Sequence, residues 1–121
     1  MRVLYVEDNQ QLRESIASLL QCEGRQVVTC ISAEEALDLD TQDPFDLVIT
    51  DVTLPGMSGL EMSSQMLAAE PLRWIVLCSG HQVQDEVKAL GPNVRALIKP
   101  FGVDDLDSVV STAEAAVGSS T

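Results

Sequence analysis

Leu47-Val48-Ile49-Thr50-Asp51 forms a short apolar run in the middle of the chain and continues as Val52-Thr53-Leu54-Pro55-Gly56. The run does not alternate between polar and apolar residues, which is typical of a parallel strand that is covered on both faces. The Pro-Gly pair that follows it indicates a turn. Asp51 is therefore predicted to stand at the C-terminal end of a buried strand, at the edge where open α/β sheets bind their ligands.

Similar apolar runs predict four further strands, at residues 3–6, 26–30, 74–79 and 94–98. Asn9, Ser32 and Ser58 stand where helices would begin, and each serine is followed three positions later by glutamate, the spacing of a capping box. One face of the first predicted helix collects Leu12, Ile16, Leu19 and Leu20. Strands that alternate with helices over short connections predict an α/β fold, a parallel sheet with helices on both faces.

Composition and charge limit the classes of function. The chain has 121 residues, enough for one domain with a substantial core, which we expect to span residues 1–117 with residues 118–121 as a tail or truncated linker. Its net charge of −12 argues against nucleic acid or an anionic membrane as a partner, since both require a cationic patch. No apolar run approaches the roughly 20 residues that span a bilayer, and the start of the chain has no secretory pattern. Three cysteines match no zinc spacing, so we interpret them as reduced thiols of a cytoplasmic protein.

Charged and polar side chains follow the predicted strands. Right-handed crossovers bring the C-terminal ends of parallel strands to one edge, where five side chains would converge: Glu7, Asp8, Asp51, Ser79 and Lys99. Clustered carboxylates repel one another, and Mg²⁺ is the hard cation that prefers such oxygen ligands. A hydroxyl and an ammonium are groups that bind phosphoryl oxygens. A carboxylate nucleophile beside them predicts the formation of an aspartyl phosphate.

Four motifs together resemble the receiver domain of two-component response regulators, the CheY-like superfamily. They are Glu7-Asp8, Asp51 with Leu54-Pro55-Gly56-Met57-Ser58-Gly59, Ser79-Gly80, and Lys99-Pro100-Phe101. The resemblance covers essentially the whole chain, with the motifs in order. It implies a flavodoxin-like (βα)5 fold, a doubly wound five-stranded parallel sheet with strand order 2-1-3-4-5.

The resemblance also implies a role for each site residue. Asp51 would accept a phosphoryl group from a phosphohistidine. Asp8, Asp51 and the backbone carbonyl of Thr53 would ligate Mg²⁺, or Mn²⁺ in its place, with Glu7 contributing through a water molecule. Ser79 and Lys99 would bind the phosphoryl oxygens. The residues that would shape the surrounding loops are Pro55, Gly56, Gly59 and Pro100.

The implied partners are a sensor histidine kinase or a histidine phosphotransfer protein, and an effector domain outside this chain. The protein would be a signalling phosphoacceptor rather than an enzyme, catalysing only its own phosphorylation and dephosphorylation. The switch region would comprise Ser79, Gly80, His81 and Ala96. Receivers usually carry an aromatic residue where Ala96 stands, and the segment between Ser79 and Lys99 is shorter than usual. These departures imply a local response to phosphorylation rather than dimerisation through the last two helices.

Three alternatives remain open on the sequence. A haloacid-dehalogenase phosphatase also uses a strand-end aspartate, but Thr53 stands where its second aspartate belongs, and the chain is short for that fold. A flavodoxin-like cofactor carrier needs a phosphate-binding loop after the first strand, where this chain has acidic residues. A degenerate receiver that serves as an interaction scaffold is favoured by Ala96 alone. His81 either influences the lifetime of the phosphoryl group or is an ordinary loop residue.

Overall fold

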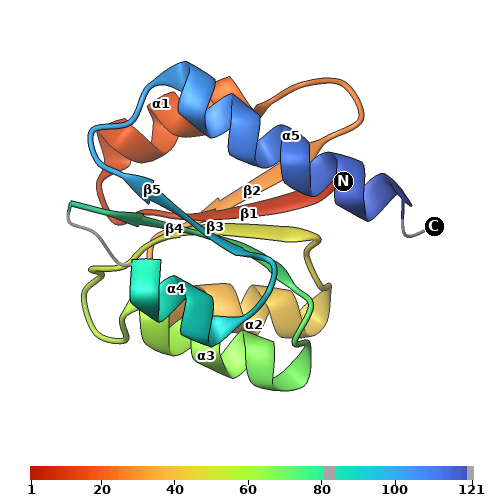
Figure 1. The fold of residues 1–121 in the computed structure, drawn as a ribbon. Helices are drawn as coiled ribbons and strands as arrows, with labels where there is room; N and C mark the ends of the chain where they lie inside the picture. The colour runs from red at the N-terminus through yellow and green to blue at the C-terminus, as the bar shows by residue number, and fades with distance from the viewer. Residues whose placement is uncertain (81–83, 120–121) are drawn as a thin grey trace.

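Five parallel strands form the centre of the computed structural model, which describes residues 1–80 and 84–119 (Figure 1). The strands are β1 Arg2–Val6, β2 Gln26–Cys30, β3 Leu47–Asp51, β4 Trp74–Ser79 and β5 Val94–Ile98. They pair in the order β2-β1-β3-β4-β5, so the predicted flavodoxin-like, CheY-like sheet is confirmed. The helices between and after them are α1 Gln10–Leu20, α2 Ala33–Gln42, α3 Gly59–Ala69, α4 Gln84–Leu90 and α5 Val103–Ser119.

The helices cover the sheet on both faces. Figure 1 shows α1 and α5 on one face and α2, α3 and α4 on the other. All five residues of β3 are buried, because this central strand is sandwiched between the two helical layers. Successive side chains of a strand point to opposite faces, so Val48 packs in the core beside α2 and α3 while Ile49 packs in the core beside α1 and α5.

The capping residues predicted from the sequence begin their helices as expected. The Asn9 side chain accepts a hydrogen bond of 3.0 Å from the backbone N–H of Leu12. Ser32 and Ser58 accept the same kind of bond from the N–H groups three positions on, at 3.2 and 3.1 Å. Each bond satisfies one of the unpaired donors in the first turn of a helix, which fixes where α1, α2 and α3 leave the site edge.

Two helices show features that the sequence pattern left open. Leu19 is 49% exposed, because α1 packs on the sheet through Ile16 and Leu20 and Leu19 lies at the margin of that apolar stripe. The last helix continues through Ser119, so Gly118 and Ser119 are helical. Among the described residues, no helix is both long enough and apolar enough to cross a membrane.

Candidate functional site

The predicted acidic residues meet at the C-terminal edge of the sheet. Glu7 and Asp8 follow β1, and Asp51 ends the neighbouring strand β3. Each offers one carboxylate oxygen, and these oxygens lie within 4.8 Å of one another. Glu7 and Asp51 are 2% and 5% exposed, whereas Asp8 is exposed. Two of the three carboxylates are therefore buried, and the cluster is accessible to solvent at Asp8.

Lys99 supplies the cation that faces this cluster. Its Nζ atom lies 2.6 Å from Asp51 Oδ1 and 3.7 Å from Glu7 Oε1. Burial alone would lower the pKa of Lys99, but the hydrogen bond with the Asp51 carboxylate and its negative charge outweigh that effect, so the pKa is raised. The ammonium is therefore charged at neutral pH and neutralises part of the cluster.

Asp51 presents a buried carboxylate to the site. Its Oδ1 atom is fully buried and is paired with the Lys99 ammonium at 2.6 Å. A buried carboxylate oxygen in this state is costly unless a charge partner or a coordinating ion satisfies it. The ion pair with Lys99 therefore stabilises the Asp51 carboxylate in its buried position.

The buried position of Glu7 changes its protonation equilibrium. Burial, followed by the hydrogen bond with the Asp51 side chain, raises the pKa of Glu7 to about 7. The backbone N–H of Asn9, which donates to Glu7 Oε2 at 3.1 Å, acts in the opposite direction. Without a cation in the cluster, Glu7 therefore gains or loses its proton near neutral pH.

This perturbation predicts a pH-dependent stability in buffer that contains a chelator. Because the pKa of Glu7 rises from its ordinary 4.5 to about 7 on folding, its contribution is fully present below pH 4.5 and is lost as the pH rises through 7. We expect a loss of up to about 3 kcal/mol, since a tenfold change in proton affinity is worth about 1.4 kcal/mol. Urea denaturation of wild type and Glu7→Gln across this range measures it. Parallel pH profiles of the two proteins would contradict the assignment.

The loop after β3 is held close to the site. A Cβ atom on Gly59 would lie 1.9 Å from the Asp51 carbonyl oxygen, so only glycine fits at the start of α3. Gly56 has a φ of +77°, which favours glycine, and the neighbouring Met57 N–H donates to Glu34 Oε1 at 3.3 Å. Thr53 lies in this loop and is exposed. Pro55 precedes the turn at Gly56, as expected.

Two side chains near the site were missed by the sequence analysis. The Glu34 side chain extends from α2 and accepts a hydrogen bond from the Met57 N–H in the loop after β3. These residues are 23 positions apart, so no local sequence pattern predicts the contact. Tyr5 lies on the same face of β1 as Glu7, and the two-residue period of a strand could have indicated it. Its hydroxyl oxygen is 3.5 Å from Glu7 Oε1.

The predicted switch residues are only partly described. Ser79 is buried at the end of β4, Gly80 is exposed, and His81 lies outside the described residues. Ala96, in β5, is partly buried. It borders two hollows of about 470 and 480 Å³, one toward α5 and one toward α4. The Lys99–Pro100 peptide bond, just beyond β5, is cis.

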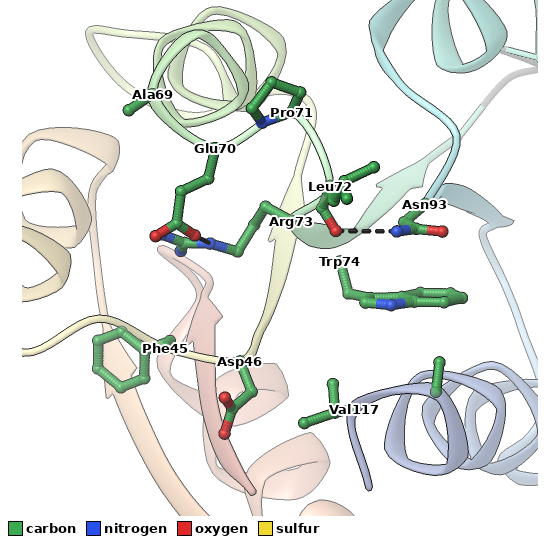
Figure 2. Close-up of a pocket in the computed structure, with 11 residues that line it drawn as sticks. Phe45, Asp46, Ala69, Glu70, Pro71, Leu72, Arg73, Trp74, Asn93 and Val117 are labelled. Carbon is green, nitrogen blue, oxygen red and sulfur yellow. Dashed lines mark hydrogen bonds and ion pairs between the residues drawn. The ribbon is translucent and has the colours of Figure 1, made fainter. Parts of the chain in front are cut away.

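A separate hollow of about 700 Å³ opens at the opposite edge of the sheet, between the segments that lead into β3, β4 and β5 (Figure 2). Its buried guanidinium, Arg73, is paired at 2.7 Å with both Asp40 and Glu70. Figure 2 also shows Asn93 bonded to the Leu72 carbonyl oxygen, at 2.8 Å. Arg73 and Asn93 are thus paired with protein groups within this edge.

Comparison with known proteins agrees with this geometry. The model of the family described as "Response regulator receiver domain" matches residues 3–111. The chain is 33% identical over 108 residues to the cell cycle response regulator CtrA of Brucella ovis. That alignment covers 88% of this chain and 47% of CtrA, so the chain spans about half the length of such relatives.

Solved structures share the fold over nearly the whole chain. A response regulator receiver domain protein from Clostridium thermocellum is 25% identical with a TM-score of 0.86, covering 99% of this chain and 98% of that one. The response regulator TrrA of Thermotoga maritima, solved in complex with Mg²⁺ and BeF, is 30% identical with a TM-score of 0.82, covering 93% and 97%.

Proposed function

This chain belongs to the response regulator receiver domain family, and we propose that Asp51 accepts a phosphoryl group in a Mg²⁺-dependent reaction. The donor would be the phosphohistidine of a sensor kinase or of a phosphotransfer protein. The observation that carries the proposal is the buried Asp51 carboxylate, which lies beside two further carboxylates and 2.6 Å from the Lys99 ammonium.

The donor set fits Mg²⁺. Glu7, Asp8 and Asp51 offer carboxylate oxygens within 4.8 Å of one another, and hard oxygen ligands on one open side suit a cation that keeps several waters. Asp8 and Asp51 would hold the ion with the Thr53 carbonyl, and Glu7 would act through water. When bound, Mg²⁺ neutralises charge on the carboxylates and on the phosphoryl oxygens. The similarity to TrrA, which was solved with Mg²⁺ and BeF, supports this cofactor.

The chemistry of the protein's own groups then follows. An Asp51 carboxylate oxygen forms a bond to phosphorus while the bond between phosphorus and the donor histidine nitrogen breaks, and the histidine departs with the electron pair. Lys99, now 2.6 Å from Asp51 Oδ1, would pair with a phosphoryl oxygen, and the Ser79 hydroxyl would donate to another. The domain would act as a signalling phosphoacceptor in the cytoplasm, with no other reaction.

The output is proposed to be local. Phosphorylation shifts an equilibrium only through contacts that differ between two states, and Ala96 carries no ring that could move. The change would therefore be confined to the segment after Ser79, including Gly80 and His81. Because relatives such as CtrA are about twice as long, an effector domain outside this chain is a proposed recipient of the signal.

Acetyl phosphate tests the proposal directly. We expect wild-type protein in Mg²⁺ to gain the mass of one phosphoryl group, and protein in excess chelator to gain none. Intact-mass spectrometry under neutral, rapid conditions measures both. Absence of any adduct, from acetyl phosphate and from phosphorylated kinases alike, would favour an interaction scaffold instead.

A further inference from the structure

Tyr5 is a buried polar residue that the proposed phosphorylation does not use. It is the only tyrosine in the chain and is 1% exposed. It lies on β1, two residues before Glu7, which directly follows the strand, so both side chains point to the same face of the sheet. Its hydroxyl oxygen lies 3.5 Å from Glu7 Oε1. The phenol therefore lies directly beneath the acidic cluster.

The surroundings of Tyr5 keep its hydroxyl protonated. Its ring belongs to the apolar core that includes Ile16, Ile49 and Cys78. Burial, followed by the negative charge of Glu7, raises the pKa of the Tyr5 hydroxyl far above its ordinary value. The group is therefore a neutral hydrogen-bond donor over the whole physiological range.

The two oxygens of Glu7 are held differently. Oε2 accepts the backbone N–H of Asn9 at 3.1 Å. Oε1 faces the Tyr5 hydroxyl at 3.5 Å and the Lys99 ammonium at 3.7 Å, and this ammonium also pairs with Asp51 at 2.6 Å. Without the Tyr5 hydroxyl, the Glu7 side chain would be oriented by the Asn9 N–H, the Asp51 side chain and the shared Lys99 ammonium.

We propose that Tyr5 is a positioning residue whose hydroxyl donates to Glu7 Oε1 and orients this carboxylate for cation binding by the cluster. The inference rests on the proposed Mg²⁺ site. The separation of 3.5 Å exceeds that of an ordinary O–H···O bond. We propose that this hydrogen bond shortens when a bound cation fixes the Glu7 carboxylate. A hydrogen bond that is stronger in the cation-bound state than in the cation-free state shifts the equilibrium toward cation binding.

Outer partners of metal ligands commonly change metal affinity when they are removed. For Tyr5→Phe, which keeps the ring and deletes one oxygen, we expect Mg²⁺ affinity to fall about three- to tenfold, since a bond to a charged acceptor is lost. Isothermal titration calorimetry measures it. Ser63→Ala is the matched control: it deletes another buried hydroxyl, bonded to the Gly59 carbonyl at 2.7 Å, and should leave the affinity unchanged.

A spectroscopic measurement separates positioning from simple packing. Because Tyr5 is the sole tyrosine, protein labelled with ¹³Cζ-tyrosine gives one resonance that reports on the hydroxyl. We expect it to shift between wild type and Glu7→Gln in chelator, and to shift again in wild type with the same Mg²⁺ dependence as the calorimetry.

The calorimetry and the NMR measurement test the proposed Mg²⁺ site and the role of Tyr5 separately. If wild type binds no Mg²⁺, the proposed function fails, while the shift caused by Glu7→Gln still decides whether the hydroxyl acts on Glu7. If Mg²⁺ binds equally well to wild type and Tyr5→Phe, the positioning role is overturned and the proposed function stands. A ¹³Cζ resonance that responds neither to Glu7→Gln nor to Mg²⁺ would also overturn the positioning role.

Discussion

Asp51→Asn is expected to abolish phosphorylation by acetyl phosphate completely. In the proposed reaction the carboxylate is the nucleophile, and an amide of the same shape cannot form the acyl phosphate. Asp51 is 5% exposed at the end of β3, with an ammonium 2.6 Å from Oδ1 and two further carboxylates within 4.8 Å. Among the described residues, no other aspartate forms an ion pair with a lysine. Intact-mass spectrometry should therefore show no adduct in this variant.

Asp104→Asn provides the matched control. Asp104 lies in the first turn of α5 and is exposed, so its replacement removes the same charge without touching the cluster. This variant should gain one phosphoryl group at the wild-type rate. A phosphorylated Asp51→Asn protein would show that another side chain is the acceptor and would reject the site assignment.

Gly59→Ala is expected to cause a large loss of stability, about 3 kcal/mol or more, because overpacking at a rigid contact forces the backbone to move. The added Cβ would lie 1.9 Å from the Asp51 carbonyl oxygen and 2.9 Å from its carbon. These are backbone atoms at the end of a fully buried strand, so no flexible side chain can move aside. We expect the melting temperature to fall by on the order of 10 °C.

Gly118→Ala is the comparison for this variant. Gly118 lies in α5, and a Cβ there would meet no atom within 4 Å. Since alanine favours helix more than glycine does, the melting temperature should stay equal or rise slightly. If both alanine variants melt at the wild-type temperature, α3 can shift away from Asp51 and the contact is not the constraint that its geometry indicates.

The sequence by itself determined the strands and the edge at which the site lies. The run of residues 47–51 carries no polar alternation, which identifies a strand buried on both faces. Asn9, Ser32 and Ser58 bond to backbone N–H groups three positions away. The apolar run and the capping residues each depend on neighbouring residues only, so they can be recognised in the sequence. They predicted β2, β3, β4 and β5 and the starts of three helices.

The tertiary structure alone decided the state of the groups at that edge. The sequence does not contain the distance of 2.6 Å between Lys99 and Asp51, the raised pKa of Glu7, or the approach of Tyr5 to Glu7. Such properties depend on how far packing removes water from each group. The burial of each group is set by strands and helices that are distant in sequence. For the same reason Leu19, although apolar and at helical spacing, is half exposed.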